Sequence, residues 1–276
     1  MRFRFLNTGD NTAAMNMAID EALLDSKLPV LRVYGWKPAA ISIGYNQDLM
    51  KHINIEACKK LGIDIVRRPT GGKAVLHDTH EMELTYSVII DLNDKNYDSD
   101  KIIPKLHKDS ILESYKIISK GILNALQSLG ISAVMKETKP IKTETAICFN
   151  EPSWYEILST NKKIVGSAQR RINGKILQHG AILIGCDVEK MCKLFNTDFD
   201  AAVKATKERV TSINQLKSLS SDKKTSFDDV ADALKQGFEE NFNLDFADDK
   251  LTDEELAAAE RLYKEKYSLD KWNLGY

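Results

Sequence analysis

The sequence predicts an α+β protein, with a mixed β-sheet flanked by helices and a helical C-terminal portion. Before Cys186, short runs rich in β-branched and aromatic residues are separated by turn residues, a pattern that favours strands. Asn173-Gly174 lies between two such runs and indicates a tight hairpin, because both central residues of a type I′ turn need positive φ. After Cys186, apolar residues recur mainly at helical spacing.

The bulk composition is that of a water-soluble globular chain. The 276 residues are 43% apolar and 29% charged, and the net charge of −1 provides no global field for nucleic acid or an anionic membrane. Residues 1–11 do not resemble a secretory leader, and no apolar run approaches the roughly 20 residues that a membrane span needs. We expect a cytoplasmic monomer. The scattered cysteines, which fit no zinc spacing, are Cys58, Cys148, Cys186 and Cys192.

Local patterns define the elements of the first half. Met15, Ala18, Ile19 and Ala22 fall on one helical face, and residues 7–11 (NTGDN) form a turn cluster before it. We expect strands at residues 2–6, 30–34, 40–44, 63–67, 75–77 and 84–90, and helices at residues 15–23 and 54–61.

Capping signals define the helices of the second half. Ser110 with Glu113 precedes an amphipathic helix at residues 111–129, and Ser226 with Asp229 precedes the next long helix. Thr252 with Glu255 repeats the signal before a helix at residues 256–266. The strands expected between these helices are residues 132–135, 154–158, 163–172 and 175–183, and the clearest linker is residues 218–224.

One cysteine and one lysine form a candidate nucleophile and activator. Cys148 ends a polar loop, and Lys163 begins the next β-like run. A thiol attacks as its thiolate, and a nearby ammonium stabilises that anion. Lys162 competes for this role, but alternation along the strand directs it away from the face of Lys163 and Ser167. A buried cysteine and a solvated lysine remain the alternative interpretation.

The glycine-containing passage at residues 67–73 (RRPTGGK) is a second candidate site. Gly71 and Gly72 let backbone N–H groups approach a ligand closely, while Arg68 and Lys73 favour an anionic or carbonyl partner. The spacing is not that of a P-loop. His77 follows on the next strand, where a hydrogen-bonded structural role competes with a role as general base.

Two further features occur around the hairpin. Gly180 follows His179 inside a strand, which indicates either a close backbone approach or a β-bulge. Arg170 and Arg171 precede the turn. Their positions fit a solvated strand edge that discourages strand pairing.

Taken together, the motifs resemble those of the biotin/lipoate protein ligase superfamily. The resemblance covers nearly the whole chain in the family's order. The segments that carry it are residues 15–24 (MNMAIDEALL), 67–78 (RRPTGGKAVLHD), 83–87 (ELTYS), 148–156 (CFNEPSWYE), 163–169 (KIVGSAQ) and 178–183 (QHGAIL). It implies a ligase-like catalytic domain over residues 1–248, with a helical tail of residues 249–276 packed on it. The passage at residues 78–83 (DTHEME) is longer than usual, which leaves open whether His77 and His80 line the pocket.

The segment CFNEPSWYE resembles the octanoyltransferase branch common in Gram-positive bacteria. That resemblance implies transfer of octanoyl from octanoyl-acyl carrier protein, through a thioester on Cys148, to a lysine of a lipoyl-domain protein. The acceptors it implies are the glycine-cleavage H protein and the E2 subunits of 2-oxoacid dehydrogenases, with no cofactor and no metal. Lys163 is the expected activator. The carrier and lipoyl domains that the resemblance implies are acidic, and a basic patch of Arg67, Arg68, Arg170 and Arg171 is expected to steer them. The expected substrate-binding residues are Arg68, Gly71, Gly72, Lys73, His77, Ser167, His179 and Gly180.

Three alternatives remain at this point. An ATP-dependent lipoate-protein ligase acts through an acyl-adenylate and does not need Cys148. An octanoyl amidotransferase moves the acyl group between lipoyl domains. A non-catalytic effector-binding protein on the same fold binds its ligand without turnover.

Overall fold

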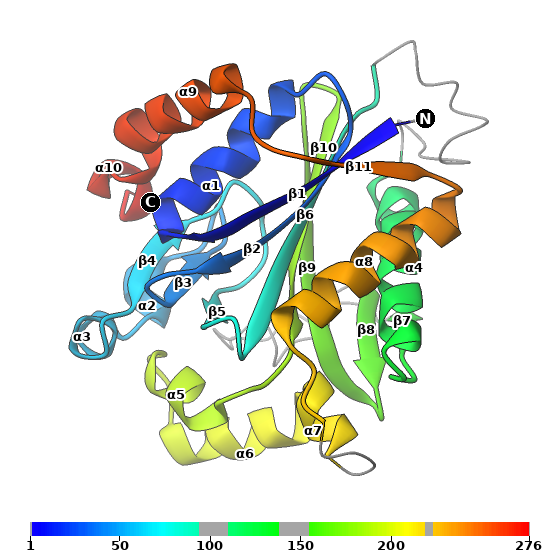
Figure 1. The fold of residues 1–276 in the computed structure, drawn as a ribbon. Coiled ribbons are helices and arrows are strands. Elements are labelled where there is room, and N and C mark those ends of the chain that lie inside the picture. The colour runs from blue at the N-terminus through cyan, green and yellow to red at the C-terminus, as the bar shows by residue number, and fades with distance from the viewer. Residues whose placement is uncertain (1, 94–109, 138–154, 219–222, 276) are drawn as a thin grey trace.

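A computed structural model describes residues 2–93, 110–137, 155–218 and 223–275 (Figure 1). In its first part the elements are β1 (Arg2–Asn11), α1 (Ala13–Ala22), η1 (Leu23–Asp25), β2 (Val30–Trp36), β3 (Ala40–Ile43), α2 (Leu49–His52), α3 (Ile55–Lys60), β4 (Asp64–Arg67), β5 (Val75–His77), β6 (Glu83–Asp91), α4 (Ile111–Ser128) and β7 (Val134–Glu137). The remaining elements are β8 (Tyr155–Ser159), β9 (Lys162–Ile172), β10 (Lys175–Leu183), α5 (Val188–Lys193), α6 (Phe199–Arg209), α7 (Ile213–Lys217), α8 (Phe227–Phe242), β11 (Asp245–Asp249), α9 (Asp253–Leu262), η3 (Tyr263–Tyr267) and α10 (Asp270–Asn273).

The strands of the described chain form two sheets. The larger has the order β11-β1-β2-β6-β10-β9-β8-β7, and the smaller has the order β4-β3-β5. β1 pairs in parallel with β2 and β11, whereas every pairing from β2 through β6, β10, β9 and β8 to β7 is antiparallel. The large sheet is therefore mixed, as predicted. The separate small sheet did not follow from the sequence.

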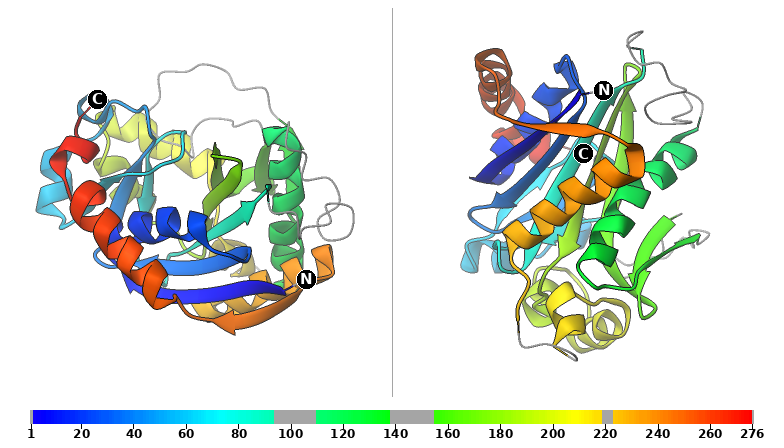
Figure 2. Two further views of the ribbon diagram at one scale, coloured as in Figure 1. Left: turned by 90° about the horizontal axis from the view of Figure 1, so that it is seen from above. Right: turned by 45° about the vertical axis from the view of Figure 1, so that its right-hand side comes forward.

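Helices cover the large sheet on both faces. α4 and α8 lie on one side, whereas α1 lies on the other side with α9 packed outside it (Figures 1 and 2). The alternation of the strands explains this layering: Leu84, Tyr86 and Val88 of β6 join the cluster under α4 and α8, and Ile89 joins the cluster under α1. A third cluster fills the space around the small sheet and α5.

Short sequence patterns such as turn and capping motifs correctly predicted most boundaries of helices and strands. The hairpin at Asn173-Gly174 has φ of 51° and 79°, and it joins β9 to β10 as expected. Complete capping boxes begin α8 at Ser226 and α9 at Thr252. The turn expected at residues 7–11 is wrong: β1 continues to Asn11 with a register shift, and Gly9 provides the positive φ there.

The C-terminal segment lies against the first helix and the small sheet. The helix expected at residues 256–266 is α9, which begins earlier, and it is followed by the π-helical turn η3. α9 and η3 pack on α1, and α10 packs next to β4. The division into residues 1–248 and 249–276 stays a prediction. Within the described ranges, no helix is both long and apolar enough to cross a membrane.

Candidate active site

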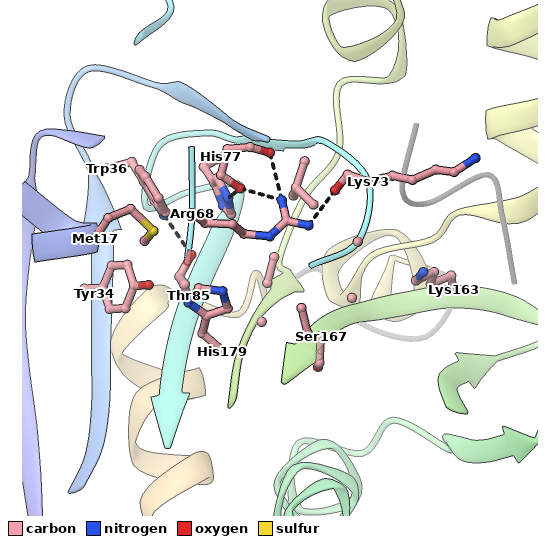
Figure 3. A pocket seen from close by; sticks show the side chains of 17 residues that line it. Met17, Tyr34, Trp36, Arg68, Lys73, His77, Thr85, Lys163, Ser167 and His179 are labelled. Carbon is pink, nitrogen blue, oxygen red and sulfur yellow. Dashed lines mark hydrogen bonds between the residues drawn. The ribbon is translucent and has the colours of Figure 1, made fainter. Parts of the chain in front are cut away.

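A cavity of about 270 Å³ lies between the two sheets, beside α1 and the loop that joins β4 to β5 (Figure 3). Met17, Tyr34 and Trp36 lie at one end of it, and Lys73 and Lys163 lie at the other (Figure 3). The lining residues are Met17, Tyr34, Trp36, Ser42, Arg68, Gly72, Lys73, Val75, His77, Thr85, Lys163, Gly166, Ser167, Ala168, His179, Gly180 and Ala181. The wall is therefore largely apolar, with polar groups at a few defined positions.

The cavity brings together residues that are far apart in the sequence. The residues named from the sequence that line it are Arg68, Gly72, Lys73, His77, Lys163, Ser167, His179 and Gly180. Gly71 is not among the lining residues, and neither is His80, whose Nε2 lies 2.7 Å from Asp10 Oδ1. Cys148 lies outside the described residues. The geometry thus assembles one candidate site without testing the role of any member.

Arg68 fixes the conformation of the glycine loop, which is the connection between β4 and β5 that contains Gly71 and Gly72. Its side chain is buried, and Nη2 donates to the carbonyl oxygens of Gly71 at 2.7 Å and Lys73 at 2.8 Å. Nη1 donates to the carbonyl of Ser42 at 2.9 Å, which ties the loop to β3. Carbonyl oxygens that converge on one guanidinium fix a loop more firmly than single contacts. Arg68 therefore shapes the cavity wall, in addition to lining it.

His77 forms part of a buried chain of hydrogen bonds. Its Nδ1 lies 2.7 Å from Glu83 Oε1, and its Nε2 lies 2.8 Å from Ser42 Oγ. The carboxylate only accepts, so Nδ1 donates to Glu83. The Trp36 ring stacks on the imidazole with centroids 4.0 Å apart. Both nitrogens of His77 are thus occupied, which favours the structural role over that of a general base.

His179 forms part of a second buried chain of hydrogen bonds. Nδ1 lies 3.0 Å from Asp20 Oδ2, and Nε2 lies 2.6 Å from Thr70 Oγ1. Burial lowers the pKa of His179 and outweighs the opposing effect of Asp20. The imidazole is therefore neutral at pH 7, donates to Asp20 and accepts from Thr70. Arg68 Nε in turn donates to Thr70 Oγ1 at 3.2 Å.

Asp20 is the buried anion of this network. It pairs with Arg32 at 2.6 Å, and neither side chain is exposed. Tyr34 donates to Asp20 Oδ2 at 3.0 Å, and Ser87 donates to Oδ1 at 2.8 Å. Burial raises the pKa of the carboxyl, but the Arg32 charge and the hydrogen bonds more than offset this, so the pKa lies below its ordinary value. Sequence reasoning missed Asp20, although a carboxylate on a predicted apolar helix could have signalled it.

The apolar end of the cavity was also missed. Met17 comes from α1, and Tyr34 and Trp36 come from β2. Trp36 Nε1 donates to Thr85 Oγ1 at 2.8 Å, and Thr85 donates to Glu83 Oε1 at 2.5 Å. These bonds fix the indole orientation at the edge of the cavity. Nothing in the local sequence distinguishes these residues from ordinary core positions.

Lys163 is held at the cavity by Glu156. The two charged atoms are 2.9 Å apart, and the side chains are 4% and 11% exposed. Lys162 reaches elsewhere, because its Nζ donates to the carbonyl of Lys207 at 2.7 Å. The prediction that Lys163 and Lys162 face different ways is therefore confirmed. Glu156, from β8, was not predicted as a site residue.

Gly180 permits a close approach between strands. A Cβ there would lie 2.6 Å from both the Gly166 carbonyl oxygen and Ser167 Oγ. The pairing of β10 with β6 and β9 continues through Gly180 without a register shift, so a bulge is excluded and the close approach is confirmed. Ser167 Oγ lies 2.7 Å from the hydroxyl of Tyr86, which is fully buried.

The predicted four-arginine docking patch is wrong. Arg67 and Arg68 are buried and bind backbone carbonyls. Arg170 donates to the carbonyl of Pro69 at 2.7 Å, and Arg171 donates to the carbonyl of Ser110 at 2.8 Å. These cations stabilise the fold around the cavity. They do not form one solvated surface.

The three described cysteines are poorly suited to nucleophilic attack. Burial raises the pKa of Cys58 to about 11, and burial together with the Asp187 charge raises that of Cys186 to about 12. Burial also raises the pKa of Cys192. Each thiol is therefore protonated at neutral pH, and none lines the cavity.

Comparisons with known proteins agree with this architecture. Residues 12–239 match the family described as "Lipoyl protein ligase A/B catalytic domain". Octanoyltransferase LipM of Bacillus subtilis (strain 168) is 38% identical over 98% of this chain and 97% of its own length. The crystal structure of a lipoate-protein ligase A bound with ATP has a TM-score of 0.80 at 28% identity, covering 100% of this chain and 99% of that one.

A further solved structure is similar over the same extent. It is that of a bipartite lipoate protein ligase from Thermoplasma acidophilum, studied with its E2 lipoyl domain, and it has a TM-score of 0.78 at 28% identity, covering 100% of this chain and 97% of that one. Fold and cavity thus define a catalytic domain of the biotin and lipoate ligase type. The chain belongs to the lipoyl protein ligase A/B catalytic domain family, which confirms the resemblance found in the sequence.

Proposed function

We propose that this protein transfers an octanoyl group from octanoyl-acyl carrier protein to a lysine of a lipoyl-domain protein, as an acyltransferase of lipoate biosynthesis. The observation that carries this proposal is the cavity itself. Its apolar end at Met17 and Trp36 can bury an acyl chain, and the cation Lys163 lies at the opposite end (Figure 3). Burying the seven or so carbons beyond the carbonyl contributes about 5 kcal/mol, at roughly 0.8 kcal/mol per CH₂.

Cys148 is the proposed nucleophile. Its thiolate attacks the carbonyl carbon of the incoming thioester; a new S–C bond forms, the donor S–C bond breaks, and the carrier thiol leaves. The acceptor lysine amine then attacks the enzyme thioester, a C–N bond forms, and the Cys148 sulfur leaves and takes up the proton that the amine loses. The incoming thioester already stores the required energy, so this route needs no ATP.

Elimination supports Cys148 in this role. The other three cysteines have raised pKa values and lie away from the cavity. The sequence places Cys148 eight positions before Glu156, whose carboxylate pairs with Lys163. Lys163 is the proposed cation that stabilises the thiolate and orients the acyl carbonyl. Backbone N–H groups at Gly166-Ser167 or Gly71-Gly72 are the proposed donors to the oxygen that gains charge.

The relatives support a lipoyl-domain acceptor. The 38% identical relative is an octanoyltransferase, and the T. acidophilum ligase was studied with an E2 lipoyl domain. E2 lipoyl domains are accordingly proposed as acceptors, whereas acyl carrier protein as donor and the glycine-cleavage H protein as a further acceptor are proposed from the resemblance of the segment CFNEPSWYE. The protein is proposed to act as a cytoplasmic monomer without a cofactor.

A lipoate-protein ligase is the second candidate, because the TM-score of 0.80 is to a ligase bound with ATP. Its 28% identity is lower than the 38% identity to the octanoyltransferase over almost the whole chain. An amidotransferase that moves octanoyl between lipoyl domains would use the same thioester and differ only in its donor.

Intact-protein mass spectrometry separates these functions. The protein is mixed with octanoyl-acyl carrier protein and no ATP. We expect a hydroxylamine-sensitive octanoyl adduct that is lost in Cys148→Ser and kept in Cys186→Ser, the control for a thiol that does not line the cavity. An adduct formed only from octanoyl-lipoyl domain would indicate the amidotransferase. Modification of the acceptor only with ATP and free acid, unaffected by Cys148→Ser, would establish the ligase instead.

A further inference from the structure

We infer that the C-terminal segment, residues 263–275, is a positioning element of the acyl cavity. Through Trp272 and Asn273 it fixes Arg67, and through Arg67 it fixes the glycine loop that forms one cavity wall. This inference rests on the proposed function, because the wall is taken to hold an acyl chain. The segment lies beyond residues 12–239, which match the catalytic-domain family, so its contribution to the cavity is not contained in that match.

The C-terminal segment forms several hydrogen bonds with Arg67, both to its backbone and to its guanidinium. The Arg67 backbone N–H donates to Asn273 Oδ1 at 2.9 Å, and Trp272 Nε1 donates to the Arg67 carbonyl at 2.8 Å. The guanidinium also donates to the carbonyl oxygens of Trp272 at 3.1 Å and Asn273 at 3.2 Å. Arg67 is fully buried, so a polar group of Arg67 that lost its partner would be left unpaired away from water, which is costly.

Arg67 also forms hydrogen bonds with the neighbouring loop, residues 44–47, so the position of this loop depends on that of Arg67. Its Nη1 donates to three carbonyl oxygens of that loop, those of Gly44 at 3.1 Å, Tyr45 at 2.9 Å and Gln47 at 2.8 Å. A lysine could not satisfy three carbonyls and the C-terminal segment together, because it lacks the planar fork of donors. Arg67 therefore links the C-terminal segment to loop 44–47.

Loop 44–47 in turn supports the glycine loop. The Tyr45 N–H donates to the Thr70 carbonyl at 2.8 Å. A Cβ at Gly44 would lie 1.8 Å from the Gly72 carbonyl oxygen, so the two backbones are in direct contact. Gly72 lines the cavity, and Thr70 anchors His179. A shift of loop 44–47 must therefore displace the wall that faces the acyl chain.

A second attachment connects the same segment to α1. Lys266 Nζ lies 2.6 Å from Glu21 Oε2, and the Tyr267 hydroxyl donates to the same oxygen. Glu21 follows Asp20, the buried carboxylate that holds His179. Asn273 Nδ2 donates to the Tyr267 carbonyl at 2.8 Å, which joins the two attachments. α10 packs beside β4 and η3 beside α1, and Figure 1 shows α9, which precedes η3, alongside α1.

The test uses two variants of the full-length protein and one matched control. Trp272→Phe keeps a ring next to Tyr45 and Tyr267 but removes the donor to the Arg67 carbonyl. Asn273→Ala removes the acceptor of the Arg67 N–H. Leu274→Ala changes the adjacent side chain, which is 46% exposed, and serves as the control.

The first readout is the ratio of transfer rates with octanoyl-acyl carrier protein and decanoyl-acyl carrier protein. This ratio does not depend on how much enzyme is folded. A loosened wall should lower the octanoyl preference of both variants several-fold, and Leu274→Ala should leave it unchanged. An unaltered ratio, with or without a loss of total activity, would overturn the inference and leave the segment a purely structural one.

The second readout is hydrogen exchange and does not require activity. The amides of Tyr45 and Arg68, which donate to Thr70 and Ile43, should exchange about tenfold faster in Trp272→Phe and Asn273→Ala, while the amides of β6 remain as protected as in the wild type. Uniform acceleration across the protein, or none, would contradict the inference. A wild-type protein that transfers no octanoyl would refute the proposed function, whereas the exchange pattern would still test the link from Trp272 to the glycine loop.

Discussion

Each histidine at the cavity has both ring nitrogens occupied by buried partners. His77 lies between Glu83 and Ser42, and His179 lies between Asp20 and Thr70. A general base needs a nitrogen that can reach the substrate, so neither ring meets this requirement in the described arrangement. Chemistry by thioester exchange does not need such a base at the acyl chain, because a thiolate and a cation perform the attack.

The pH dependence of stability should report on His179. Burial lowers its pKa from the ordinary 6.5, so below about pH 6.5 the unfolded state takes up a proton that the folded state resists. Stability should therefore fall as the pH is lowered, by up to about 1.4 kcal/mol per pH unit for one proton. Urea unfolding between pH 5 and pH 7.5 measures this slope, and His179→Gln should reduce it. Equal slopes in both proteins would contradict the assignment.

Removing Lys163 should separate its catalytic role from its structural role. Lys163→Met removes the cation at the cavity, and we expect octanoyl transfer to fall by about 100-fold or more, the usual effect of losing one electrostatic stabiliser. The substitution also removes the cation 2.9 Å from the Glu156 carboxylate, and loss of one member of a buried ion pair costs about 3–5 kcal/mol. The measurements are transfer rate and urea unfolding, with Lys162→Met as the matched control.

The double variant Lys163→Met with Glu156→Gln completes this test. Neutralising Glu156 removes the carboxylate charge that faced Lys163, so stability should recover while transfer stays low. Recovery of transfer together with stability would show that Lys163 acts only on the fold.

At the scale of elements, the glycine loop shows that two adjacent glycines have different tasks. Gly72 has φ of +94°, and a Cβ there would lie 2.9 Å from Arg68 Nη2. At Gly71 a Cβ meets open space, and the φ there is not positive. The sequence indicated both glycines equally, because the conformation of each depends on Arg68 and its carbonyl partners.

Alanine substitutions should distinguish these two positions. Gly72→Ala strains the backbone and should destabilise the protein by about 1 kcal/mol or more, and it should lower octanoyl transfer by displacing Arg68. Gly71→Ala should be close to neutral or slightly stabilising, because it reduces only the freedom of the unfolded chain. Thermal unfolding and transfer rates measure both effects. Similar losses in the two variants would refute this distinction.

Elements set by adjacent residues could be predicted, and those set by distant partners could not. The Asn173-Gly174 hairpin and the caps at Ser226 and Thr252 depend on a few neighbouring residues, and each formed as expected. The burial of Arg67 depends on Asn273, 206 positions away. Arg67 therefore resembled a surface cation in the sequence, and the docking patch built on it was wrong.

At the scale of the whole molecule, the two faces of the large sheet are separate in function. Residues such as Ile122 and Phe238 fill the side covered by α4 and α8, whereas the cavity lies between the large sheet and the small one. Most cavity residues lie within the family motifs, because the strands and the glycine loop that line the cavity have distinctive sequences. The apolar end at Met17 and Trp36 escaped prediction, since its residues are ordinary core types until the fold joins them.

This separation predicts that a core substitution under α8 can weaken the fold without altering the site. Phe238 is 2% exposed and packs directly over Gly121, where a Cβ would lie 2.6 Å from its ring. Phe238→Ala should cost about 3–5 kcal/mol in unfolding free energy, because the helices cannot fully close the space that it leaves. Asp232→Ala, at an exposed position of the same helix, should change stability by no more than about 0.5 kcal/mol.

The measurement for Phe238→Ala combines urea unfolding with octanoyl transfer at 15 °C, expressed per folded molecule. We expect the rate and the preference for octanoyl over decanoyl to match those of the wild type. The reason is that the cavity wall is fixed through Arg67, loop 44–47 and the C-terminal segment, whereas α8 packs mainly on α4, β6 and β11. A changed chain-length preference in Phe238→Ala would mean that strain crosses the large sheet, and that the two faces are not independent.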